Sequence, residues 1–103
     1  MIQVSPSLLS SDFTRLGEAV GIINSSRASM IHIDVMDGVF VPNISIGFPV
    51  ISSISRVAEK PLDVHLMITD PGRYVSEVRD SGAWLMCVHY EACTHLHRVV
   101  SAI

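Results

Sequence analysis

The sequence of 103 residues predicts an α/β fold, in which the strands of a parallel sheet are joined by crossover helices. Short apolar runs rich in β-branched residues alternate with longer segments of helical periodicity, as parallel sheets require. The strand–helix unit recurs about every 25–30 residues, close to one eighth of a (β/α)8 TIM barrel of about 200–250 residues. Residues 1–103 therefore predict a single partial domain, about the first four units of such a barrel.

Four segments have the composition of buried strands, because they are short, apolar and rich in β-branched or aromatic residues. The expected strands are Ile2–Ser7, Ser29–Val35, Leu62–Ile68 and Trp84–Tyr90. We expect them to run parallel in the order of the chain.

Helices are expected between these strands. Asp12 can cap the first, whose apolar residues recur at spacings of three and four. Asp70 can cap the third, with Pro71 at its first helical position. The expected helices run from Asp12 to about Ser26, over Phe48–Glu59, from Asp70-Pro71 to Ser81-Gly82, and onward from near Thr94. The last seven residues contain no glycine, asparagine or proline, so we expect the sequence to stop inside a helix of a longer barrel.

Charge and hydropathy exclude several classes of partner. Seven basic and ten acidic residues give a formal charge of −3, and no cluster of lysine and arginine is present. Nucleic acid and a membrane surface are therefore not expected as partners. The first residues do not have the pattern expected of a signal peptide, and no apolar run approaches the roughly 18 residues of a membrane span, so a cytoplasmic protein is expected.

Polar residues interrupt the second and third expected strands near their carboxyl ends. His32, Asp34 and Met36 share one face, because side chains alternate along a strand. In the next strand His65 and Met67 share a face. Asp63 is expected opposite to them or lower down the strand. A buried histidine or carboxylate is costly unless it is paired or bound to a metal.

The carboxyl ends of parallel strands form one rim, so His32, Asp34 and His65 are expected to converge. Two imidazoles and one carboxylate suit a divalent cation such as zinc, iron(II), manganese or cobalt. The alternative is that the three are hydrogen-bonded polar residues that support the barrel. The spacing does not select one metal.

Other residues near this rim are weaker candidates for a role in the site. Asp37 lies an odd number of residues from Asp34 and should point away, so a structural role is expected. Gly38 is expected to supply an unusual backbone angle in the loop that follows. His89 ends the fourth expected strand, where a structural hydrogen bond is favoured over substrate contact.

Three motifs together resemble the ribulose-phosphate 3-epimerase family over the whole chain. They are Ser5-Pro6-Ser7-Leu8-Leu9-Ser10-Ser11-Asp12-Phe13, His32-Ile33-Asp34-Val35-Met36-Asp37-Gly38-Val39-Phe40-Val41-Pro42-Asn43 and Pro61-Leu62-Asp63-Val64-His65-Leu66-Met67. Val88-His89-Tyr90-Glu91-Ala92 is similar to the end of the family's fourth strand. The resemblance implies a barrel enzyme that interconverts D-ribulose 5-phosphate and D-xylulose 5-phosphate by inverting carbon 3.

The resemblance also implies roles for individual residues. His32, Asp34 and His65 would bind the divalent metal, and Asp34 would also be one of two catalytic acid/base carboxylates. Ser7, Met36, Met67 and His65 would contact the sugar-phosphate substrate. The opposite carboxylate and the phosphate site belong to late strands of the family's barrel, outside these residues.

Two alternatives remain open from the sequence. An allulose 6-phosphate 3-epimerase shares the His-x-Asp-x-Met-Asp motif, and this half of a barrel carries little discrimination of sugar length. The chain could instead be a catalytically incomplete half-barrel. Such a half would expose two sheet edges and the inward faces of its strands, so a homo-oligomer is expected.

Overall fold

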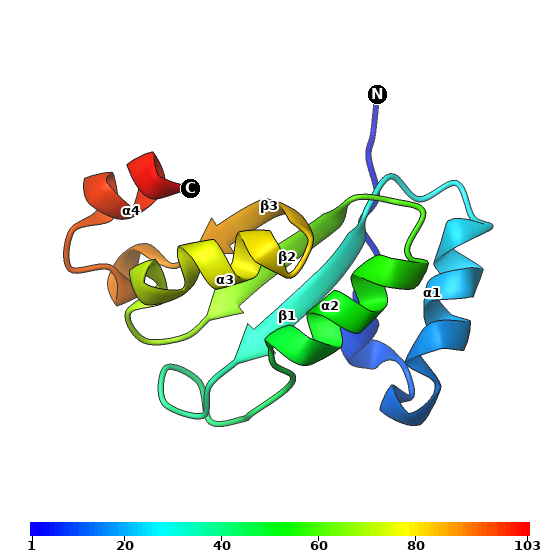
Figure 1. Cartoon of the computed structure of the whole chain (residues 1–103), viewed down its shortest axis with the longest axis horizontal. Helices are drawn as coiled ribbons and strands as arrows, with labels where there is room; N and C mark the ends of the chain where they lie inside the picture. The colour runs from blue at the N-terminus through cyan, green and yellow to red at the C-terminus, as the bar shows by residue number, and fades with distance from the viewer.

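The computed structural model describes residues 1–103 as three parallel strands with helices packed against one face (Figure 1). The strands are β1 (Ile31–Met36), β2 (Leu62–Met67) and β3 (Ala83–Val88), adjacent in chain order. The α-helices are α1 (Leu16–Asn24), α2 (Phe48–Val57), α3 (Val75–Asp80) and α4 (Leu96–Ala102). The 3-10 turns are η1 (Leu8–Ser10), η2 (Phe13–Arg15), η3 (Pro71–Tyr74) and η4 (Tyr90–Ala92). None of these helices has the length and hydropathy that a membrane span requires.

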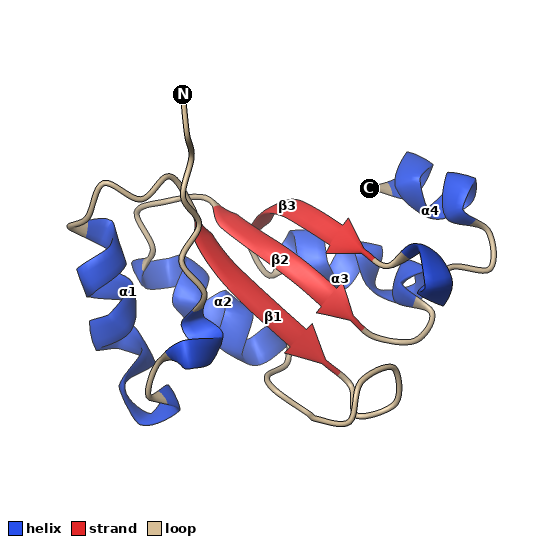
Figure 2. Cartoon of the chain, turned by 180° about the vertical axis from the view of Figure 1, so that it is seen from behind, coloured by secondary structure: helices blue, strands red, loops and turns tan.

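The core lies between the sheet and its helices because β1 and β2 each bury alternate side chains. Along both strands every second residue is buried, in each case an isoleucine, valine or leucine. These side chains meet Ile51 and Ile54 of α2, and Val78 of α3. The view from behind shows the other face of the sheet, which no α-helix covers (Figure 2). The residues between the buried ones therefore point to an open face.

The first expected strand is wrong, because residues 2–7 form no regular strand. The segment runs beside β1, where Val4 O accepts from Ser29 N at 2.8 Å and Pro6 O accepts from His32 N at 2.8 Å. Only one isolated parallel bridge forms, between Ser7 and His32. Pro6 has no N–H to donate to a ladder, and Ile2 is 90% exposed, so neither hydrogen bonding nor burial extends the pairing.

The helices also begin differently from what the sequence predicts. Asp12 does cap, accepting from Thr14 N at 2.9 Å, but the residues after it form the 3-10 turn η2 before α1 begins. Asp70 does not cap a helix, because its backbone is left-handed at a φ of 53° and its side chain makes no capping bond. Pro71 begins η3 instead, and α3 follows. At the end of α3 Gly82 takes a φ of 112°, which turns the chain into β3.

Candidate metal centre

The candidate site lies on the open face of the sheet, where β1 and β2 run side by side. In their parallel register Asp34 pairs with His65, His32 with Asp63, and Met36 with Met67. Because all six residues alternate with the buried residues of their strands, their side chains share this face. Asp63 therefore lies on the same face as His65 and lower on the strand; the alternative that it faces the opposite way is wrong.

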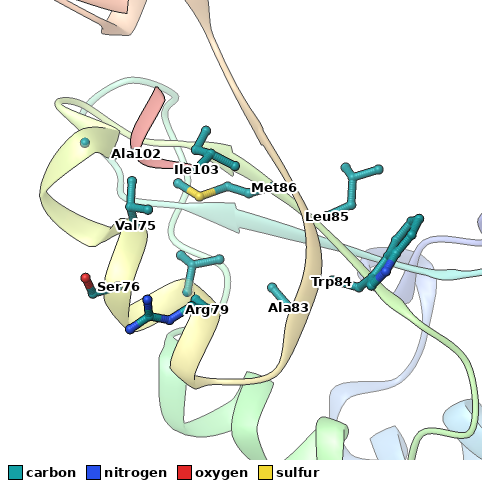
Figure 3. Close-up of a pocket in the computed structure, with 11 residues that line it drawn as sticks. Val75, Ser76, Arg79, Ala83, Trp84, Leu85, Met86, Ala102 and Ile103 are labelled. Carbon is teal, nitrogen blue, oxygen red and sulfur yellow. The ribbon is translucent and has the colours of Figure 1, made fainter. Parts of the chain in front are cut away.

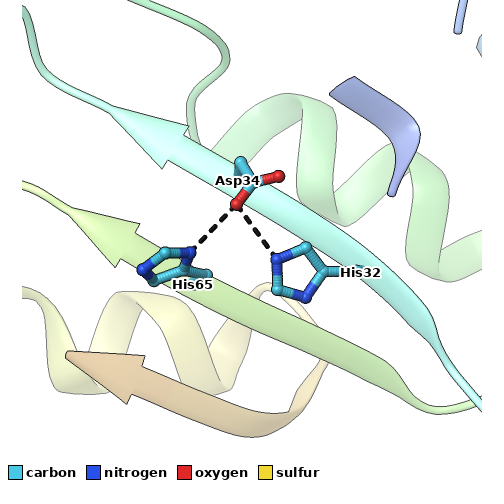
Figure 4. A group of neighbouring side chains, drawn as sticks. All are labelled: His32, Asp34 and His65. Atoms are coloured by element: carbon cyan, nitrogen blue, oxygen red, sulfur yellow. Dashed lines mark hydrogen bonds and ion pairs between the residues drawn. The ribbon is translucent and has the colours of Figure 1, made fainter. Parts of the chain in front are cut away.

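One oxygen of Asp34 lies between the two histidines (Figure 4). Asp34 Oδ1 is 3.0 Å from His32 Nε2 and 3.0 Å from His65 Nδ1. One ligand atom from each of the three residues lies within 4.8 Å of the others. The side chains are 24%, 11% and 23% exposed for His32, Asp34 and His65, so the group is shielded but reachable from solvent.

Two serines of the N-terminal segment reach the same face. Ser7 Oγ donates to Asp34 Oδ2 at 2.8 Å, and Ser5 Oγ donates to Asp63 Oδ2 at 3.2 Å. Ser7 Oγ also accepts from Leu9 N at 3.2 Å. This bond caps the start of η1 and holds the Ser7 hydroxyl in place. The segment that fails to form a strand thus places a hydroxyl on each of two neighbouring carboxylates.

The neighbours of His32 and Asp34 shift their titration in opposite directions. Burial lowers the pKa of His32, but the hydrogen bond to Asp63 and the negative charges of Asp34 and Asp63 outweigh burial, and the pKa is raised. Burial raises the pKa of Asp34, but the Ser7 hydroxyl and the two histidines outweigh it, and the pKa is lowered. Both directions favour a positive charge next to the Asp34 carboxylate.

The loop after β1 is held by Asp37, which takes the structural role that the sequence predicts. Asp37 Oδ1 accepts from Val39 N and Phe40 N at 2.9 Å each, and Oδ2 accepts from Thr69 N at 2.8 Å. These bonds lower the pKa of Asp37, and the bond from Thr69 N makes the largest contribution. Gly38 has a φ of 74°, as expected for this turn. Asp37 therefore joins the loops after β1 and β2 and contributes no ligand.

Sequence reasoning did not assign a role to Asp63 in the site, and for His89 it favoured a structural hydrogen bond over substrate contact. Asp63 Oδ2 lies 2.8 Å from His32 Nδ1. His89 Nε2 lies 2.7 Å from His65 Nε2, and the two rings stack with centroids 4.9 Å apart. The available signal for Asp63 was its even spacing from His65, which places both side chains on one face of β2.

A separate hollow of about 310 Å³ lies along the outer edge of β3, between α3 and the end of α4 (Figure 3). Eight of its eleven lining residues are hydrophobic, among them Trp84 and Met86 of β3. It contains none of the candidate site residues. This hollow is therefore separate from the candidate site on the open face of the sheet.

The donor set of the site fits a divalent metal. Two imidazole nitrogens and one carboxylate oxygen converge, and this combination suits zinc, iron(II), manganese or cobalt. Three protein ligands leave positions for a further ligand, which is the arrangement of catalytic rather than structural zinc sites. No buried side-chain nitrogen or oxygen lacks a hydrogen-bond partner, so the cluster is also satisfied as it stands.

Comparisons with known proteins agree on one family. The model of the ribulose-phosphate 3-epimerase family matches residues 3–103. The chain is 50% identical to the ribulose-phosphate 3-epimerase of Bacillus subtilis (strain 168), over all of this chain and 48% of that protein. It is 48% identical to the Synechocystis enzyme and 47% identical to the chloroplastic Arabidopsis thaliana enzyme, over 99% of this chain and 45% and 37% of those proteins. The chain therefore spans about half the length, or less, of these curated relatives.

Proposed function

Because the chain belongs to the ribulose-phosphate 3-epimerase family, we propose that it is the metal-binding half of an enzyme that inverts carbon 3 of D-ribulose 5-phosphate and D-xylulose 5-phosphate. The whole enzyme would be a (β/α)8 barrel, with the open face of this sheet as its interior. The observation that supports the proposal most directly is the convergence of His32, Asp34 and His65 on the open face of two adjacent parallel strands.

A divalent metal held by these three residues would stabilise the negative charge that develops on the substrate's oxygens when the carbon-3 proton is removed. Asp34 supplies the base for one face of carbon 3. Its second oxygen is held by Ser7, so the carboxylate keeps one orientation between the histidines while a proton moves.

The residues beside this group suit the binding of a small polar substrate. Met36 and Met67 are adjacent in register at the carboxyl ends of their strands, where apolar side chains would exclude water from the reacting carbon. Ser7 and His65 are close enough to Asp34 to contact the same sugar phosphate. Inversion also needs a second base on the opposite face, and the family resemblance assigns it to a later strand.

Metal binding by the chain tests the proposal directly. Titration with Zn²⁺ or Co²⁺, followed by calorimetry and by the visible spectrum of cobalt, should show one equivalent bound. His65→Ala and Asp34→Ala should each abolish that binding. His97→Ala is the matched control, because His97 is exposed on α4 and outside the cluster. Equal binding by all four proteins would contradict the site.

Substrate identity needs a separate assay. Carbon-3 epimerisation should be measured by proton NMR with D-ribulose 5-phosphate and with D-allulose 6-phosphate, on a protein that joins this chain to the rest of a family barrel. We expect the joined protein to epimerise the pentulose phosphate, and we expect Asp34→Asn to abolish that activity. If the protein prefers the hexulose phosphate, the proposed substrate is wrong, but the proposed epimerisation at carbon 3 is retained.

A further inference from the structure

The two ligand histidines differ in what holds the ring nitrogen that faces away from Asp34. For His32 that nitrogen is Nδ1, and it lies 2.8 Å from the carboxylate oxygen Oδ2 of Asp63. For His65 it is Nε2, and it lies 2.7 Å from Nε2 of His89. One histidine is therefore supported by an anion and the other by a second imidazole.

This difference affects which nitrogen carries the proton. A neutral imidazole has one N–H donor and one lone-pair nitrogen, and only the lone pair can bind a metal. A carboxylate can only accept, so the bond between Asp63 and His32 places the proton on Nδ1. Nε2 of His32, the nitrogen that faces Asp34, then keeps its lone pair. An imidazole partner such as His89 can donate or accept, and it imposes no such choice.

Asp34 competes for the His32 proton less well than Asp63 does. Asp34 Oδ1 is 3.0 Å from His32 Nε2, and it is shared with His65 Nδ1 at the same distance. Asp63 Oδ2 is closer, at 2.8 Å, and it contacts no other ring. Ser5 donates to the same Asp63 oxygen at 3.2 Å and helps to fix the carboxylate. The Asp63 side chain is only 14% exposed, so water competes poorly for this bond.

We propose that Asp63 is a positioning residue, which orients the His32 ring and holds its proton on Nδ1 so that Nε2 is ready to bind the metal. The inference rests on the proposed function, because it gives Asp63 a role only if His32 is a ligand. Carboxylates that support ligand histidines in this way typically contribute about 10–100-fold to metal affinity.

Metal affinity of matched variants tests the role. Asp63→Ala should weaken Zn²⁺ binding by about 10–100-fold. Asp63→Asn should lose less, because its amide oxygen still accepts from Nδ1 although the charge is gone. Asp80→Asn removes the same charge from α3, where the side chain is 68% exposed, and should leave affinity within about twofold. Far-UV circular dichroism of each metal-free variant checks that the fold is kept.

A spectroscopic measurement separates positioning from a general loss of stability. In the zinc-loaded protein the Nδ1 proton of His32 should give a slowly exchanging, downfield ¹H–¹⁵N signal, because Asp63 accepts its hydrogen bond. Asp63→Ala should lose that signal, whereas Asp80→Asn should keep it. If the wild-type chain binds no zinc, the proposed function fails and this inference fails with it. If the wild type binds zinc and both Asp63 variants match its affinity, this inference alone is overturned.

Discussion

Ile33→Ala tests whether the site depends on the core beneath it. Ile33 lies between the candidate ligands His32 and Asp34 in the sequence, but it is 1% exposed and faces the helices. The substitution removes three carbons, worth about 2.4 kcal/mol at roughly 0.8 kcal/mol each. The cavity left behind adds to this, so we expect a loss of about 3–4 kcal/mol in the free energy of unfolding.

That loss is large for this chain. At roughly 0.05–0.15 kcal/mol per residue, a domain of 103 residues has a total stability of about 5–15 kcal/mol. Urea unfolding followed by far-UV circular dichroism measures the change. Ile33→Val removes one carbon and should cost about 0.5–1.5 kcal/mol, which keeps the test measurable if Ile33→Ala unfolds.

Ile22→Ala is the matched control, because it removes the same atoms from α1 at a side chain that is 73% exposed. We expect that control to change stability by no more than about 0.5 kcal/mol. The reasoning is refuted if Ile33→Ala costs less than about 1 kcal/mol or no more than the control.

Three further measurements test the loops and the site. Gly82→Ala should lower the urea midpoint of unfolding, since the φ of Gly82 is 112° and an added Cβ would clash with Ser55 Oγ. Gly21→Ala is the control and should raise the midpoint slightly, because nothing lies close to the added Cβ. Because the pKa of Asp37 is lowered in the folded chain, its ionised carboxylate stabilises the fold at pH values above the ordinary carboxyl pKa. That stabilisation should be lost as the pH falls through the folded pKa. Asp37→Asn should therefore reduce the pH dependence of the thermal midpoint in that acid range. Zinc at 100 times its dissociation constant should stabilise the chain by about 2.7 kcal/mol, and EDTA or His65→Ala should remove the gain; an unchanged midpoint in zinc would count against the site.

The buried face of the sheet and the candidate ligand residues on its open face could be predicted, because both follow from local periodicity. A strand alternates its side chains whatever it packs against, so the apolar residues of β1 and β2 identify one face and His32, Asp34 and His65 the other. The types of donor are likewise a property of the sequence, which is why a divalent metal could be predicted before the geometry.

Contacts between distant segments were decided only by the tertiary structure. The parallel register of β1 and β2 places Asp63 beside His32. The spacing of residues within either strand does not predict this pairing. Residues 2–7 have the composition of a strand, yet they form one isolated bridge, because pairing needs donors and burial on both sides. The sequence by itself therefore determined which side chains share a face and what they can bind. The fold decided which of them touch, because hydrogen bonds between strands depend on register and not on order along the chain.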